Sequence, residues 1–182
     1  GYRGSARVLG AEVSAWGRAL YERIGVAFET PISFGRLTAR ENLRYFAAMY
    51  TRATRDADEL LEAVGLSGDA DVPGAHMSKG MGVRLNLARA LLPDPELLFL
   101  DEPTSVLDPA RVVQVEEIID HQRRRGRTVV VTTHDMVLAQ RACDRVGFIV
   151  DGRLLETGDP AGMRRRHGTP EVLVTWEGGS AR

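Results

Sequence analysis

The sequence is built around the segment LLFLDEP, residues 97–103. Its four leading apolar residues are typical of a strand buried on both faces of a parallel sheet. Asp101 and Glu102 then fall at the C-terminal end of that strand, where open α/β sheets bind ligands, and Pro103 prevents the strand from continuing. Two carboxylates at this edge suit Mg²⁺ and an attacking water in phosphoryl transfer. Taken alone, the pair is equally compatible with a solvated acidic turn.

Three further motifs surround this segment. MSKGM (residues 77–81) opens a helical pattern that stops at Pro93, TSVLD (104–108) follows the acidic pair, and TTHD (132–135) closes a second apolar strand. In this order and at these spacings, the motifs resemble those of the ATP-binding subunit of an ABC transporter. The match runs over nearly the whole chain.

Composition narrows the class of protein. The 182 residues are 43% hydrophobic, enough for one domain with a core, and the formal net charge of −1 gives no global field for nucleic acid or an anionic membrane. Cys143 is the only cysteine, and the four histidines show no close metal-ligand spacing. No apolar run approaches the roughly 20 residues of a membrane-spanning helix, and the N-terminus does not read as a signal peptide. We therefore expect a soluble, intracellular chain.

The resemblance implies an α/β fold: the three-layer core of P-loop NTPases, with a mainly parallel sheet and an inserted helical subdomain. We expect one partial domain over residues 1–182, made of the helical subdomain with the signature (about 36–92), the core (93–158) and a C-terminal tail (159–182). The patterns predict an edge strand at 7–13, a strand at 24–28, buried strands at 97–101 and 128–132, a hairpin of 146–150 with 153–155, and a last strand at 171–176. Helices are predicted at 38–50, 56–64, 78–92, 108–125 and 135–142, with a short basic helix after Pro160.

The segment Ser78, Lys79, Gly80, Met81 has two physical readings. Exposed N–H groups at a helix start, a hydroxyl and the Lys79 charge favour phosphate, yet an ordinary serine-capped helix has the same pattern. By resemblance it is the ABC signature, usually Leu-Ser-Gly-Gly-Gln, in the form found in drug and ABC-2-type exporters. That role implies contact with the γ-phosphate of ATP held by the opposite subunit.

The resemblance also assigns roles at the acidic edge. Asp101 matches the Walker B aspartate that helps hold Mg²⁺, Glu102 the catalytic glutamate that polarises the attacking water, and His134 the switch histidine at the γ-phosphate. A lone histidine at a strand end is more often structural, but its TTHD context favours the switch role. Asp108 matches the D-loop aspartate at the dimer interface, and it also reads as the N-cap of the helix that Pro109 opens. Val106 stands where the family has glycine.

Glu29 falls where the family has the Q-loop glutamine, which contacts Mg²⁺ and couples to the membrane domain. A glutamate can still coordinate Mg²⁺, but it adds negative charge near ATP. We therefore expect an altered nucleotide response rather than loss of function.

The sequence contains no P-loop. That motif needs Gly-x-x-x-x-Gly-Lys-Ser/Thr, and the only lysine, Lys79, belongs to the signature. We expect an N-terminally truncated chain, without the first strands, that does not hydrolyse ATP by itself.

The runs at 123–125 and 164–166 are all arginine and lie at predicted helix C-termini. A solvated face is the favoured interpretation of these runs, over a nucleic-acid or lipid patch.

The interpretation that follows is an ATPase subunit of an ABC exporter, using ATP and Mg²⁺. Its implied partners are a second ATP-binding subunit and a transmembrane permease, without nucleic acid, at the inner face of the cell membrane. Two alternatives stay open. One is a non-catalytic accessory subunit that lends its signature to a P-loop-competent partner; the other is a soluble ABC-type ATPase acting on nucleic acid or ribosomes.

Overall fold

The computed structural model describes residues 4–167, and the chain divides into two compact units between Met136 and Val137. The division falls inside the segment 93–158 that the sequence assigns to the core. The strand expected at 171–176 lies outside the described residues. Within residues 4–167, no helix combines the length and apolar character needed to cross a bilayer.

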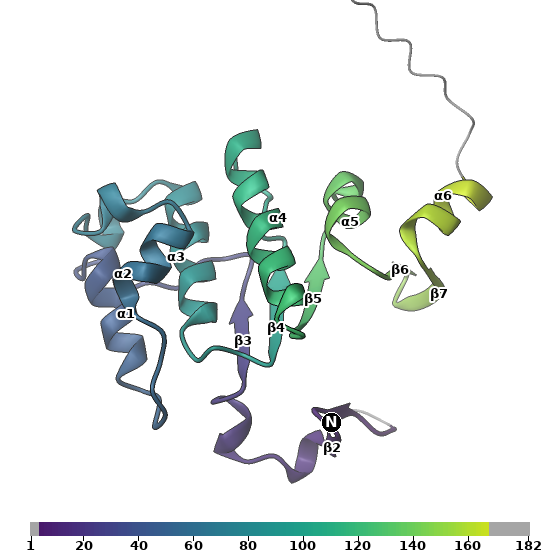
Figure 1. Ribbon diagram of the computed structural model, residues 1–182, viewed down its shortest axis with the longest axis horizontal. Helices are drawn as coiled ribbons and strands as arrows, with labels where there is room; N and C mark the ends of the chain where they lie inside the picture. The colour runs from purple at the N-terminus through teal and green to yellow at the C-terminus, as the bar shows by residue number, and fades with distance from the viewer. Residues whose placement is uncertain (1–3, 168–182) are drawn as a thin grey trace, which may run out of the picture. The chain divides into compact units, whose positions relative to one another are not determined.

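The first unit is organised on a parallel sheet of three strands in the order β3-β4-β5 (Figure 1). These are β3 (Ile24–Ala27), β4 (Leu97–Asp101) and β5 (Thr128–Thr132). β4 lies in the middle, parallel to both neighbours, and Leu98 and Leu100 are buried. The predicted parallel sheet and the buried strand at 97–101 are thus confirmed.

The prediction that β5 is buried is wrong. Its residues alternate between exposed and half-buried, and Val130 is 42% exposed. Within residues 4–167, β5 pairs only with β4 and forms the edge of the sheet. A run of apolar residues indicates that a strand could be buried. Whether it is buried depends on which strands flank it, and the rest of the fold decides that.

Helices connect the strands. Between β3 and β4 come α1 (Ala39–Ala47), α2 (Ala57–Ala63), the 3₁₀ turns Ser67–Asp69 and Gly74–His76, and α3 (Lys79–Leu91). The predicted capping box of α1 is present: the Glu41 N–H donates to Thr38 Oγ1 at 3.2 Å, and the Thr38 N–H donates to Glu41 Oε2 at 2.9 Å. α4 (Pro109–Arg124) joins β4 to β5 and packs against β5.

Helix α3 and strand β3 approach each other closely at Gly25. A Cβ placed on Gly25 would lie 2.0 Å from the carbonyl oxygen of Ala90. Only glycine allows the two backbones this near. The buried residues of α3 include Leu87 and Leu91.

The N-terminal segment differs from the edge strand expected at 7–13. It forms a short antiparallel hairpin of β1 (Arg7–Val8) and β2 (Ala11–Glu12). The two turn residues, Leu9 and Gly10, both have positive φ, of 48° and 83°. Such a turn reverses the chain after two residues, so the weak alternation could not continue as one strand. The 3₁₀ helices Val13–Ala15 and Arg18–Leu20 then lead to β3.

The second unit contains a hairpin and a basic helix. After α5 (Met136–Ala142), which begins at the division, β6 (Val146–Val150) pairs antiparallel with β7 (Arg153–Gly158). The predicted turn at Asp151-Gly152 is confirmed, with φ of 50° and 72°. α6 (Pro160–His167) follows, and Arg166 pairs with Glu156 at 2.6 Å.

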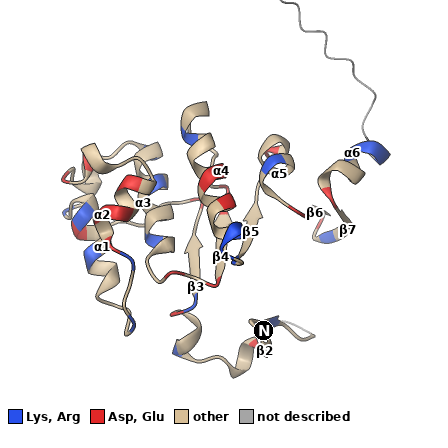
Figure 2. Ribbon diagram, in the orientation of Figure 1, with Lys and Arg blue, Asp and Glu red and all other residues tan. Residues whose placement is uncertain are grey.

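Both signs of charge occur along α1 and α4, as Figure 2 shows, whereas α2 carries only acidic residues and α6 only basic ones. At the end of α4, Arg124 pairs with Asp120 at 3.0 Å and Arg125 with Asp94 at 2.7 Å. These ion pairs support the interpretation of the 123–125 run as a solvated face rather than a free basic patch.

Candidate functional site

The carboxyl edge of the sheet brings Asp101 next to Thr132. The parallel register pairs these two positions at the ends of β4 and β5, and the Thr132 hydroxyl donates a short hydrogen bond to Asp101 Oδ1. Parallel strands end at the same edge, which is why two residues 31 apart in the sequence meet here. Sequence reasoning named Asp101 but not the threonine that orients it.

Glu102 occupies an unusual backbone conformation at this edge. Its φ is +47°, in the left-handed region that non-glycine residues seldom adopt. Its N–H donates to the carbonyl oxygen of Thr132 at 2.9 Å, which fixes the residue just beyond the strand end. Strained residues of this kind cluster at functional sites.

The side chain of Glu102 contacts His134. Oε1 accepts the His134 backbone N–H at 3.1 Å and lies 2.9 Å from the ring Nδ1. The Glu102 side chain is 21% exposed, whereas the His134 side chain is 82% exposed. The predicted catalytic pair is therefore one hydrogen-bonded unit, with the carboxylate inside and the imidazole at the surface.

The second carboxylate oxygen of Glu102 is unpaired. Oε2 is buried and has no hydrogen-bond partner among the described residues. Leaving a buried carboxylate oxygen without a donor is costly, so a bound water or substrate hydroxyl would be stabilised there. Such an oxygen can accept a proton from an attacking water, which is the chemistry of a general base.

His134 should titrate above the ordinary range of histidine. The hydrogen bond to Glu102 and its negative charge raise the pKa of His134, with smaller contributions from Asp135 and Glu29. Because the folded pKa is raised, the stabilisation from the ion pair is fully present below the ordinary histidine pKa of 6.5 and is lost as pH rises through the folded pKa. We expect an NMR titration of the His134 ring to show a pKa above 6.5, and Glu102→Gln to lower it. An unchanged His134 pKa in the variant would contradict the pairing.

Glu29 lies at the same edge of the sheet. It follows β3 by two residues, it is exposed, and its charge is close enough to contribute to the raised pKa of His134. The structure therefore places the carboxylate of the Q-loop position near the predicted switch histidine. Its contact with Mg²⁺ stays a prediction.

Asn86 is a site residue that the sequence analysis missed. It is 2% exposed in the middle of α3; its Nδ2 donates to the carbonyl oxygen of Phe28 at 2.7 Å, and its Oδ1 accepts from Arg89 Nη2 at 2.7 Å. It thereby fixes the backbone immediately before Glu29. The available signal was a polar residue inside an apolar helical run, between Leu85 and Leu87.

Replacing Asn86 by Ala should destabilise the chain by about 2 kcal/mol, because the Phe28 carbonyl oxygen and the Arg89 guanidinium would lose a buried partner. The free energy of unfolding in urea measures this change. Amide hydrogen exchange should also quicken around Phe28 and Glu29. As a control, Asn86→Asp keeps the acceptor for Arg89 but not the donor for Phe28, so it should quicken exchange at this loop as well. Unchanged exchange at residues 28–30 in both variants would show that Asn86 does not hold the loop.

The signature segment and the D-loop form a second group. Ser78 caps α3, accepting the Met81 N–H at 3.2 Å, and Asp108 caps α4, accepting the Arg111 N–H at 3.1 Å, as predicted. A Cβ placed on Gly80 would lie 3.5 Å from Leu107 Cδ2 and 3.7 Å from the Val106 carbonyl oxygen. Residues 78–81 and 106–108 are thus neighbours, with Lys79 and Ser78 exposed at the start of a 13-residue helix.

The donors present suit a partial magnesium site. Among residues 4–167, no group of three or more His, Cys, Asp or Glu side chains could hold a metal ion. Mg²⁺ is commonly bound by one or two carboxylates together with substrate phosphates and water. The exposed carboxylate of Asp101, oriented by Thr132, fits one such ligand.

Comparison with known proteins agrees with this geometry. The family model for ABC transporters matches residues 1–105. The fluoroquinolones export ATP-binding protein of Mycobacterium tuberculosis (strain CDC 1551 / Oshkosh) is 48% identical over 175 residues, covering 96% of this chain and 58% of the relative. The Nod factor export ATP-binding protein I of Rhizobium sp. (strain N33) is 37% identical over 94% of this chain and 61% of the relative. The chain thus spans about three-fifths of the length of these relatives.

A solved structure of an ATP binding subunit of an ABC transporter has the same fold. Its TM-score is 0.79 at 28% sequence identity, covering 91% of this chain and 71% of that structure. The family match covers more than half of the chain, and the fold agrees with it. The chain therefore belongs to the ABC transporter family and has the fold of its ATP-binding subunits.

Proposed function

We propose that the chain is part of an ATP-hydrolysing subunit that powers export across the cell membrane. The observation that carries this proposal is the hydrogen-bonded group of Asp101, Thr132, Glu102 and His134 at the carboxyl edge of the parallel sheet. The sequence identity to two export ATP-binding proteins favours an exporter over the other members of the family.

Each residue of the group has a definite task in this proposal. Asp101, held by Thr132, supplies a ligand for Mg²⁺, directly or through water. The unpaired Oε2 of Glu102 accepts a proton from the attacking water, while Oε1 stays bound to His134. The exposed ring of His134 reaches the γ-phosphate, and its raised pKa favours the cationic form that attracts a phosphate oxygen. Bound Mg²⁺ supplies neutralisation of the phosphate charge.

The nucleotide site is completed from outside residues 1–182. These residues contain no P-loop motif, so the lysine that holds the β- and γ-phosphates must come from elsewhere. We propose that this chain alone does not hydrolyse ATP. In the working assembly the signature segment faces the nucleotide held by a second ATP-binding subunit; this segment consists of Ser78, Lys79, Gly80 and Met81. The neighbouring Asp108 lies at the same interface between the subunits. A transmembrane permease is the other partner, which places the protein on the inner face of the membrane.

The test is phosphate release from ATP by the purified 182-residue chain and by the full-length gene product. We expect no ATP turnover by the 182-residue chain and measurable ATP turnover by the full-length gene product. The gene product should co-purify with a membrane subunit and without nucleic acid. Turnover by the chain alone would refute its dependence on an outside P-loop. An inactive gene product that restores turnover in a second subunit would favour the accessory role, and co-purified nucleic acid would favour the soluble ABC-type ATPase.

A further inference from the structure

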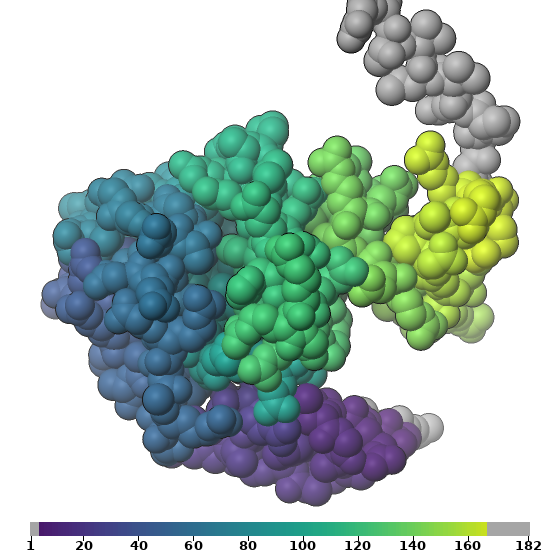
Figure 3. All heavy atoms as spheres, viewed as in Figure 1, coloured from purple at the N-terminus to yellow at the C-terminus, as the bar shows by residue number. Residues whose placement is uncertain are grey.

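A hollow of about 340 Å³ lies at the opposite edge of the sheet from the candidate site. Its lining comes from the segment between α1 and α2 (Ala53, Thr54, Arg55), from Asp94 before β4, and from His121 and Arg125 at the end of α4. Figure 3 shows the blue α1–α2 region and the green part of α4 side by side on the viewed face. Asp94 precedes β4 and Asp101 ends it, so the length of this strand, about 13 Å, separates the two places.

The hollow holds more positive than negative charge. Asp94 is its one carboxylate, and it is shared by two arginines: Arg125 binds it with two contacts of 2.7 and 2.9 Å, and Arg127 binds Oδ2 at 2.9 Å. The hydrogen bond from Arg125, supported by the charges of Arg127 and Arg55, holds the pKa of Asp94 below its usual value. Asp94 is therefore ionised and fully engaged, and three guanidinium groups surround a single negative charge.

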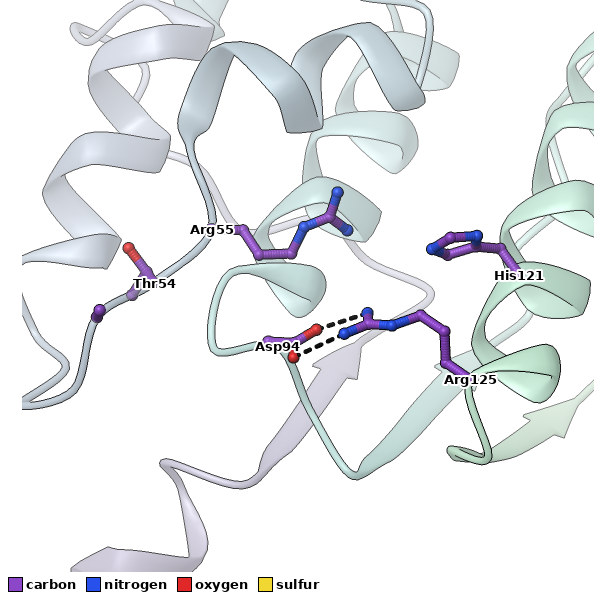
Figure 4. A pocket seen from close by; sticks show the side chains of 6 residues that line it. Thr54, Arg55, Asp94, His121 and Arg125 are labelled. Atoms are coloured by element: carbon purple, nitrogen blue, oxygen red, sulfur yellow. Dashed lines mark hydrogen bonds and ion pairs between the residues drawn. The ribbon is translucent and has the colours of Figure 1, made fainter.

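Arg55 is the group without a partner. Its backbone N–H donates to the Leu92 carbonyl oxygen at 2.9 Å, which fixes its position, but its guanidinium makes no hydrogen bond or ion pair with any of residues 4–167. Figure 4 shows the Arg55 side chain directed toward the same space as the His121 ring, with the Arg125–Asp94 pair beside it. The neighbouring carboxylate of Asp56 is engaged elsewhere, because it caps α2 by accepting the N–H groups of Asp58 and Glu59.

We propose that this hollow binds a phosphate-type oxyanion. The planar fork of Arg55 provides two parallel donors to the anion, His121 provides a third from the opposite wall, and Arg125 supplies charge. Arg55, Arg125 and Arg127 carry three positive charges and Asp94 carries one negative charge, so the net charge of plus two matches the charge of a phosphate dianion. Because Arg55 belongs to the segment between α1 and α2 while His121 and Arg125 belong to α4, the anion joins the helical segment to the core helix.

The anion is therefore a stabilising ligand distinct from the nucleotide. It binds at the N-terminal ends of the strands, whereas the candidate catalytic groups follow their C-terminal ends. By binding to the folded first unit, the anion should raise the melting temperature as its concentration rises above the dissociation constant. A free phosphate and the phosphate of a lipid head group share this chemistry, so the experiment includes both.

Isothermal titration calorimetry of the 182-residue chain with inorganic phosphate, against chloride at equal ionic strength, tests the proposal. We expect saturable phosphate binding and a phosphate-dependent rise in melting temperature. Arg55→Gln should weaken the affinity by about tenfold or more, and Arg55→Lys, which keeps the charge without the fork, by less. The matched control is Arg124→Gln, because Arg124 is an exposed arginine next to Arg125 in the sequence but pairs with Asp120 and does not line the hollow.

Sedimentation with phosphatidylcholine vesicles that contain phosphatidic acid separates the two sources. If the chain binds the vesicles, and if both added phosphate and Arg55→Gln abolish that binding, the ligand is a lipid head group. If the chain does not bind the vesicles, the ligand is free phosphate. No saturable phosphate binding by the folded chain, or equal weakening by Arg55→Gln and Arg124→Gln, would overturn the proposal.

Discussion

Glu102→Gln in the full-length, ATP-hydrolysing protein should lower kcat by about 100-fold or more, while ATP binding persists. The substitution keeps the size of the side chain and an oxygen that can accept the backbone N–H of His134. In the unaltered protein this hydrogen bond to Glu102 Oε1 is 3.1 Å long. What it removes is the negative charge, and with it the ability of the buried Oε2 to accept a proton from water. The loss should therefore appear in the chemical step and not in the affinity for nucleotide.

Single-turnover phosphate release and equilibrium binding of ATP separate these two effects. Glu117→Gln is the matched control, because Glu117 is an exposed carboxylate on α4 away from the acidic edge. Its rate should stay within about twofold of the unaltered protein. If Glu102→Gln and Glu117→Gln have the same rate, Glu102 is not the general base and the proposed mechanism fails.

Gly25→Ala should destabilise the first unit by about 3 kcal/mol, a large effect for one added methyl group. The new Cβ would lie 2.0 Å from the Ala90 carbonyl oxygen, 2.9 Å from its carbonyl carbon and 3.1 Å from Leu98 Cδ1. Two of these atoms are backbone, so α3 and β3 must move apart rather than a side chain rotate. The displacement would also reach Glu29, which follows β3.

Equilibrium unfolding in urea measures this effect, with limited proteolysis as a second readout if the variant is too unstable for a full curve. Gly68→Ala is the control, since a Cβ there meets nothing within 4 Å and should change stability by less than about 0.5 kcal/mol. A Gly25→Ala protein as stable as this control would show that the close approach of α3 to β3 is not tightly packed.

Local features were predictable from the sequence because their causes are local. The caps at Thr38, Ser78 and Asp108 need only a side chain within three residues of the amide it accepts, and the Asp151-Gly152 turn needs only two residues that tolerate positive φ. The central strand β4 was predictable because four consecutive apolar residues suit a place with neighbours on both sides.

Features that depend on long-range neighbours were not predictable in the same way. The burial of β5 depends on which strands flank it, so the TVVVT pattern alone gave the wrong result. Resemblance placed Asp101, Glu102 and His134 near one another, but not the Thr132 hydrogen bond or the unpaired oxygen of Glu102. The Asn86 contact to Phe28 spans 58 positions, and the contact of Arg125 with Asp94 spans 31, with no pattern in the sequence that links them.

The exposed edge of β5 has a practical consequence for handling the chain. Within residues 4–167 one side of this strand offers unpaired N–H and C=O groups, in a segment of three consecutive valines. Such an edge is a template for a strand from another molecule, so concentrated solutions of the isolated chain should form intermolecular sheet over time. Protein concentration, rather than temperature, then sets the useful lifetime of a sample, and each titration should begin from freshly prepared monomer.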